Sequence, residues 1–169
     1  MQDAREKRGD VRRRARYVGL DVGEVRLGVA ALEDGVATPL STLTRAGTRR
    51  DIAAVQALVG LPPAGAVVGL PPEADDPRTC AARRAREFAR RLHEATGWEV
   101  VLVDEADSTA IARARLQALG LRASGLRGHL DSWAAVEILQ RFAAGAPAEA
   151  APRTAEAPLV QGRRSRGRR

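Results

Sequence analysis

Cysteine, histidine, lysine and aromatic residues are all scarce in this chain of 169 residues, and these scarcities narrow the possible structures. Cys80 is the single cysteine, so no internal disulfide can form. Two histidines and one cysteine also argue against a zinc site of the common Cys/His type. No apolar run approaches the ~20 residues that a membrane helix needs, and the N-terminus lacks the apolar core of a secretory signal. We therefore expect a soluble, cytoplasmic protein with no membrane contact.

Positive charge is concentrated at the two ends of the chain. Residues 1–16 hold seven basic and three acidic side chains, and residues 146–169 hold six and two, whereas residues 17–145 hold 15 and 16. Both end segments are poor in large apolar residues, so we expect disordered basic tails around one domain at 17–145. One hypothesis is that the tails supply affinity for nucleic acid. The alternative is a general preference for arginine, since Lys7 is the only lysine.

The segment between the tails alternates strand and helix patterns. Hydrophobic periodicity, turn residues and capping residues predict the order strand, strand, strand, helix, strand, helix, strand, helix, helix. The expected strands are 17–23, 25–33, 36–43, 64–71 and 98–105, and the expected helices are 48–60 (capped by Thr48), 76–97 (capped by Asp76), 108–120 and 130–145. This order predicts an α/β fold with a mixed five-stranded sheet flanked by helices.

The stretch RYVGLDVGEVRLGVA (16–30) has the pattern of a buried strand, yet it contains Asp21. Side chains alternate along a strand, so Asp21 shares a face with Gly19 and Gly23. We interpret these two glycines as leaving open space in front of the carboxylate. A buried, unpaired carboxylate costs several kcal/mol, so a cation is expected in that space.

Two further acids occupy unusual positions. Glu105 ends the strand 98–105, and the ligands of open α/β sheets gather at the carboxyl ends of strands. Asp131 opens the helix 130–145, and the positions four, seven and eleven residues later are all apolar. Its carboxylate should therefore follow the buried stripe of the helix toward the sheet.

Three carboxylates that converge need a cation between them. Oxygen ligands without histidine or cysteine suit Mg²⁺ or Mn²⁺. Two such ions ~4 Å apart can activate a water molecule and stabilise the leaving oxygen of a phosphodiester. Asp21, Glu105 and Asp131 therefore predict a two-metal phosphodiesterase site.

Simpler interpretations of these acids remain open. Asp131 has the chemistry of a helix N-cap, and Asp104 or Glu105 could serve a turn or cap before the next helix. Asp21 is the hardest to explain structurally, because aspartate and glycine are both disfavoured inside strands.

Four segments together resemble the YqgF family of ribonuclease H-like proteins, also called RuvX, Holliday junction resolvases or pre-16S rRNA nucleases. In chain order these segments are GLDVGEVRLGVA, VVGLP, VDEADST and DSWAAVEIL, and the resemblance covers about residues 17–143. It implies a ribonuclease H-like fold in which Asp21, Glu105 and Asp131 are the catalytic, metal-binding acids.

The chain departs from the family pattern at two places. Val25 stands where the family usually has lysine before Arg26, and Ala106 and Asp107 stand where it has arginine and leucine. The missing cationic groups would weaken phosphate binding unless the terminal arginines compensate.

Cationic residues beside the acids are the expected contacts to the substrate backbone. The loop LRASGLRGH (121–129) directly precedes Asp131, and its two glycines would allow it to move. The residues expected to bind nucleic acid are Arg26, Arg122, Arg127 and His129. An ordinary helix connection is the alternative for this loop.

The resemblance favours a metal-dependent endonuclease that trims the 5′ end of the 16S rRNA precursor. A second hypothesis is a nuclease of four-way DNA junctions, and a third is a catalytically inactive nucleic-acid-binding module. A nucleotide-binding fold of the sugar-kinase and actin type would need about twice this length. The expected partner is precursor rRNA or branched DNA, bound by a monomer or homodimer.

Overall fold

The computed structural model describes residues 15–72, 81–105, 108–120 and 129–152. Its sheet begins with three antiparallel strands, β1 (Tyr17–Val22), β2 (Arg26–Glu33) and β3 (Val36–Thr44). Asp34 and Gly35 join β2 to β3 with positive φ angles of 49° and 80°. Two consecutive positive φ angles are typical of a tight hairpin turn, which confirms the turn predicted at residues 33–35.

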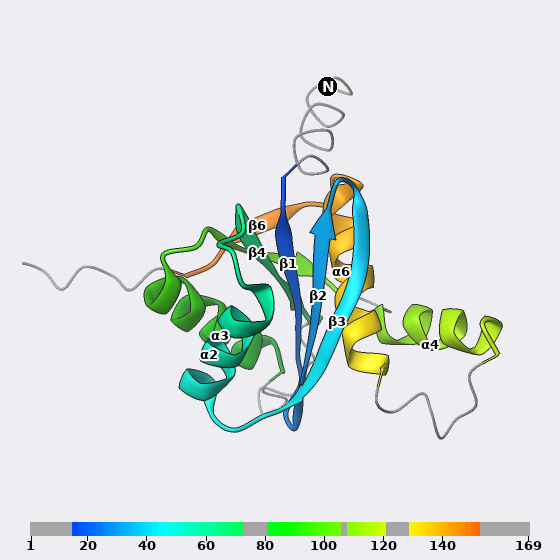
Figure 1. The fold of residues 1–169 in the computed structure, drawn as a ribbon, viewed down its shortest axis with the longest axis horizontal. Coiled ribbons are helices and arrows are strands. Elements are labelled where there is room, and N and C mark those ends of the chain that lie inside the picture. The colour runs from blue at the N-terminus through cyan, green and yellow to red at the C-terminus, as the bar shows by residue number, and fades with distance from the viewer. Residues whose placement is uncertain (1–14, 73–80, 106–107, 121–128, 153–169) are drawn as a thin grey trace, which may run out of the picture.

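Two parallel strands and a short antiparallel one complete the sheet. β4 (Gly65–Leu70) pairs in parallel with β1, and β5 (Val100–Asp104) pairs in parallel with β4. The strand order is β3-β2-β1-β4-β5-β6 (Figure 1). The predicted mixed sheet is confirmed, but it has six strands where five were expected.

The sixth strand lies in a segment that was expected to be a disordered tail. β6 (Ala148–Ala150) pairs antiparallel with β5, and the Ala151 backbone N–H donates to the Val100 carbonyl at 2.9 Å. The expectation of a tail from residue 146 is therefore wrong for these residues. Alanine and glutamate have low strand propensity, so only the free hydrogen-bonding edge of β5 makes this segment a strand.

Helices cover both faces of the sheet. α2 (Thr48–Val59) and α3 (Ala81–Thr96) lie on one face, and α6 (Leu130–Ala143) lies on the other (Figure 1). α4 (Ser108–Ala118) packs against α6, where Arg115 pairs at 2.8 Å with the buried Glu137. Among the described helices, none is both long and apolar enough to cross a membrane.

Alternation along β1 assigns its side chains to the two layers. Val18, Leu20 and Val22 belong to the core beneath α2 and α3, which also contains Phe88 and Leu92. The intervening residues, Gly19 and Asp21, therefore face α6. The buried stripe of α6 includes Ala135, Ile138 and Phe142, as the spacing from Asp131 predicted.

One capping prediction is wrong, and the alternative interpretation of Asp131 as an N-cap is excluded. Gly47 caps α2 in place of Thr48, with a φ of 104° that favours glycine. His129 precedes α6 as its N-cap residue, so Asp131 lies in the first turn of the helix. Neither helix has a side-chain cap hydrogen bond. The predicted cap at Asp76 lies outside the described residues.

Candidate active site

The three predicted acids come from three elements that meet at one edge of the sheet. β1, β4 and β5 are parallel, so their carboxyl ends lie together, with Asp21 near the end of β1 and Glu105 directly after β5. The Glu105 backbone N–H donates to the Leu70 carbonyl at the end of β4 at 3.0 Å. Asp131 reaches the same edge from α6, whose first turn lies over Gly28, the β2 partner of Asp21.

Burial and mutual repulsion raise the pKa values of two of these acids. Burial, followed by the charge of Asp131, raises the pKa of Asp21 to about 7. Burial, then the charges of Asp21 and Asp104, raises the pKa of Glu105 to about 8, against the opposing effect of Arg141. Oε2 of Glu105 is buried and has no hydrogen-bond partner among the described residues. Both side chains therefore lie where a cation would be stabilised.

Glycines let α6 approach the sheet closely. A Cβ on Gly19 would overlap Leu139, and a Cβ on Gly28 would overlap the backbone carbonyl of Asp131. The interpretation that Gly19 leaves open space for ions is therefore wrong, because α6 fills that space. Gly23 instead belongs to a tight turn, since its Cβ would meet the carbonyl of Arg26.

Sequence analysis missed Gly28 and Gly69 as residues that shape the site. Gly69 lies inside β4, where a Cβ would overlap Oε2 of Glu105 and Cδ1 of Ile138. The absent side chain is thus what gives the Glu105 carboxylate its place over the sheet. The available signal was a glycine inside each of two apolar strands, a position that often marks a close approach.

Arg26 lies at the site and pairs with one of the acids. Its Nε is 2.6 Å from Oδ2 of Asp131, and its side chain is 45% exposed. The neighbouring Val25 is 66% exposed. A cationic group that is half in solvent beside the acids is accessible to a substrate phosphate.

The other predicted nucleic-acid contacts have different outcomes. His129 is exposed at the start of α6, so it is close in sequence to Asp131 and open to solvent. Arg122 and Arg127 lie outside the described residues. Arg141, which sequence analysis did not single out, donates from Nη1 to the Asp104 carbonyl at 3.2 Å and is the cation that opposes the rise in the pKa of Glu105.

The donor set fits a divalent cation, although the side chains are not arranged around one. Three carboxylates and an unpartnered buried oxygen are the ligand chemistry that Mg²⁺ and Mn²⁺ prefer. Across the described residues, however, no three acidic, histidine or cysteine side chains form a group ready to hold an ion. Asp131 is instead paired with Arg26, so one of the three carboxylates is held by a different cation.

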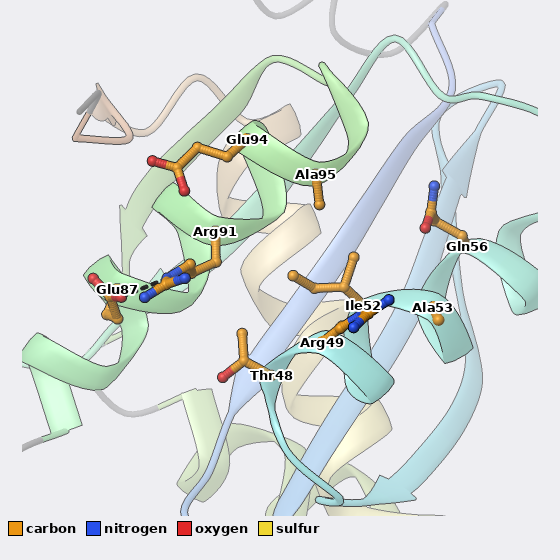
Figure 2. A pocket seen from close by; sticks show the side chains of 9 residues that line it. All are labelled: Thr48, Arg49, Ile52, Ala53, Gln56, Glu87, Arg91, Glu94 and Ala95. Atoms are coloured by element: carbon orange, nitrogen blue, oxygen red, sulfur yellow. Dashed lines mark hydrogen bonds and ion pairs between the residues drawn. The ribbon is translucent and has the colours of Figure 1, made fainter. Parts of the chain in front are cut away.

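A separate cavity of about 730 Å³ lies between α2 and α3 (Figure 2). Ile52 and Ala53 line it from α2, and the Glu87–Arg91 ion pair lines it from α3. It contains none of the three acids. The convergent carboxylates, and not this cavity, therefore define the candidate active site.

Comparison with known proteins gives the family. A family model described as "RuvX: Holliday junction resolvase" matches residues 15–144. The chain belongs to the RuvX family. The predicted family and the predicted nuclease class are thus confirmed.

Curated RuvX relatives carry the name "Putative pre-16S rRNA nuclease". The relative from Anaeromyxobacter sp. (strain Fw109-5) is 42% identical over 133 residues, which cover 77% of this chain and 97% of the relative. The relative from Mycobacteroides abscessus is 39% identical over 132 residues, covering 75% and 80% respectively. Both alignments therefore span most of the two proteins.

A solved structure shares the RuvX fold. T. thermophilus RuvC in complex with a Holliday junction substrate matches with a TM-score of 0.52 at 16% identity, covering 76% of this chain and 92% of that one. The similarity supports the predicted ribonuclease H-like architecture.

The metal-free protein is expected to lose stability as the pH rises from about 4 to about 8. The pKa values of Asp21 and Glu105 are raised from 3.8 to about 7 and from 4.5 to about 8, so the folded state binds protons more tightly than the unfolded state. The stability that this tighter proton binding provides is complete below the unfolded pKa values and is lost as the pH rises through the folded ones. A rise of about three pKa units corresponds to on the order of 4 kcal/mol per group, and the two groups are coupled, so the total is below the sum.

Thermal unfolding across this pH range, in a chelator and in Mn²⁺, measures the effect. Mn²⁺ should raise the melting temperature most at the upper end, because protons no longer compete for the carboxylates there. A melting temperature that is independent of pH in the chelator would contradict the raised pKa values.

Proposed function

We propose that this chain is a divalent-metal-dependent endonuclease that processes the 5′ end of the 16S rRNA precursor. The observation that carries the proposal is the convergence of Asp21, Glu105 and Asp131 at one sheet edge, with the pKa values of the first two raised. Relatives about 40% identical to the chain bear the name of a pre-16S rRNA nuclease, which supports the choice of substrate. A precursor rRNA substrate would place the activity in the cytoplasm.

The three acids would hold Mg²⁺ or Mn²⁺, in two positions if both ions are needed. Bound divalent cations supply activation of water and stabilisation of charge on the phosphate oxygens. Asp21 and Glu105 contribute deprotonated carboxylates, which the rise in their pKa values makes basic and strongly dependent on a nearby positive charge.

Arg26 would change partners during this process. Asp131 would hold the cation with the carboxylate that now pairs with Arg26, and the Arg26 guanidinium would then be free to bind the substrate backbone. Arginine binds phosphate oxygens through charge-assisted hydrogen bonds, so Arg26 would orient the scissile region. His129, exposed at the start of α6, lies on the same approach.

Cleavage assays with two substrates test the proposed function. The full chain is incubated with precursor 16S rRNA and with a four-way DNA junction, with and without Mn²⁺, and the new 5′ ends are mapped. We expect cleavage only with Mn²⁺, and precursor rRNA cut about tenfold or more faster than the junction.

Each other outcome has a clear meaning. Preferred cleavage of the junction would replace the proposed substrate by branched DNA. Binding of RNA without cleavage in Mg²⁺ or Mn²⁺ would identify an inactive nucleic-acid-binding module. The Asp34→Asn variant, altered in an exposed turn between β2 and β3, is the matched control for any active-site substitution of aspartate.

A further inference from the structure

The turn between β1 and β2 connects two residues of the candidate site. It spans residues 23–25, directly after Val22 and directly before Arg26, so it joins the strand of Asp21 to the ion-pair partner of Asp131. Glu24 and Val25 are exposed, and the contact of Glu24 with the rest of the fold is a long ion pair with Arg84 of α3 at 3.8 Å, which leaves the Glu24 side chain 82% exposed. The β1–β2 ladder ends at the Val22–Leu27 pair, so the placement of Arg26 relative to Asp21 depends on this ladder and on what holds the turn beyond it.

Arg45 holds both ends of the turn. Its Nη1 donates to the Gly23 carbonyl at 2.8 Å, and its backbone N–H donates to the Val25 carbonyl at 2.8 Å. Arg45 directly follows β3, so these bonds tie the end of β3 to the turn as well. The two carbonyls that it binds lie on either side of Glu24.

Arg45 is itself fixed by a buried partner. Its Nε lies 2.5 Å from Oδ2 of Asp51 in α2, a residue that is only 3% exposed. The other carboxylate oxygen, Oδ1, accepts the Ala46 backbone N–H at 2.8 Å. The Arg45 guanidinium also lies 5.4 Å from the centre of the Phe88 ring in α3. Contacts with α2 and α3 thus set the direction of the guanidinium.

We propose that Arg45 is a positioning residue, which Asp51 and Phe88 orient so that it fixes the β1–β2 turn and with it the relative placement of Asp21 and Arg26. This inference rests on the proposed function, because it concerns the same site. Arg45 touches neither the substrate nor the acids in this role. It acts through the backbone of the turn.

The geometry of the Arg45–Asp51 ion pair indicates a role in positioning the turn in addition to stabilising the fold. A buried ion pair is often no more stabilising than well-packed apolar residues of similar volume. Arg45 uses its planar fork for two different acceptors, the Asp51 carboxylate and the Gly23 carbonyl. Lysine could neutralise Asp51 but has one compact ammonium group, so it cannot reproduce this bridge.

Two variants of the full chain separate the bridge from charge neutralisation. Arg45→Lys keeps a positive charge for Asp51 and loses the fork. The double variant Arg45→Met with Asp51→Asn removes both charges, keeps an acceptor for the Ala46 N–H, and leaves no unpaired carboxylate if Arg45→Lys fails to fold. Arg90→Lys, in an exposed α3 ion-pair network with Glu87 and Glu94, is the matched control.

The readouts are Mn²⁺ affinity by calorimetry, kcat and KM for precursor rRNA at saturating Mn²⁺, and amide hydrogen exchange of residues 22–27. We expect both Arg45 variants to lower kcat about tenfold or more, to weaken Mn²⁺ binding severalfold, and to leave KM within about twofold. Exchange in the turn should accelerate, and Arg90→Lys should match the wild type in every readout.

Failure of the positioning role of Arg45 and failure of the proposed nuclease function give different results in these experiments. Wild-type kcat and Mn²⁺ affinity in Arg45→Lys, or in the double variant, would overturn the positioning role while leaving the nuclease intact. A wild-type chain that neither binds Mn²⁺ nor cleaves RNA would overturn the proposed function and this role with it.

Discussion

Asp21→Asn is expected to lower cleavage by about a hundredfold or more and to raise the melting temperature of the metal-free protein. The amide cannot supply an anionic oxygen to a cation, so Mn²⁺ binding should weaken together with cleavage. The same change removes a carboxylate whose pKa is raised by burial and by Asp131. At pH 8 the variant should therefore be more stable than the wild type by roughly 2–4 kcal/mol.

Cleavage assays, calorimetry with Mn²⁺ and thermal unfolding in a chelator measure the three effects. The stability difference should disappear below about pH 4, where the wild-type carboxyl is protonated in both the folded and the unfolded state. The Asp34→Asn control should change none of these quantities, because asparagine tolerates the positive φ of that turn. Wild-type cleavage by Asp21→Asn would remove Asp21 from the mechanism.

Gly28→Ala is expected to be nearly as damaging to activity, although it removes no functional group. The new Cβ would overlap backbone atoms of Asp131 and Ser132, which cannot rotate away as a side chain would. The first turn of α6 must therefore move off the sheet and carry the Asp131 carboxylate with it. We expect a loss of about 3 kcal/mol in unfolding free energy and a loss of about a hundredfold in kcat.

A substitution at Gly97 is the control that separates a loss of stability from a loss of activity. Gly97 has a φ of 71° and open space around its Cβ position, so Gly97→Ala strains the backbone without displacing any element. That variant should lose roughly 1–2 kcal/mol of stability and keep its activity at a temperature where it is folded. Full activity in Gly28→Ala, measured at the same temperature, would contradict the placement of α6 against β2.

Local sequence patterns were sufficient for much of the fold. Strand alternation identified the face on which Asp21 lies, and helical spacing placed Asp131 on the buried side of α6, because both patterns depend on residues close together in the chain. The hairpin at residues 33–35 followed from its own residues for the same reason. The family resemblance supplied the connection between these local elements and the ribonuclease H-like architecture.

Contacts between distant residues could not be predicted in this way. The close approach of α6 to Gly28 joins positions about a hundred residues apart, and neither segment alone indicates it. Arg45 and Gly23 are 22 residues apart, and the hydrogen bond between them depends on the paths of β3 and the β1–β2 turn. β6 has no strand pattern of its own, because the exposed edge of β5 determines its conformation.

The edges of the sheet also bear on how the protein behaves at high concentration. β3 is one outer strand, and its Pro39 lacks an N–H, while the register of the β2–β3 pair shifts between Val29 and Ala30. β6, the other outer strand, is three residues long, and its Glu149 pairs with Arg86 of α3. Short, irregular and charged edges are poor templates for adding a strand from another molecule. The β6 edge is therefore a poor template for edge-to-edge aggregation. The β3 edge is nine residues long and exposes Val36 and Leu40, so Pro39 and the register shift are the features that interrupt it.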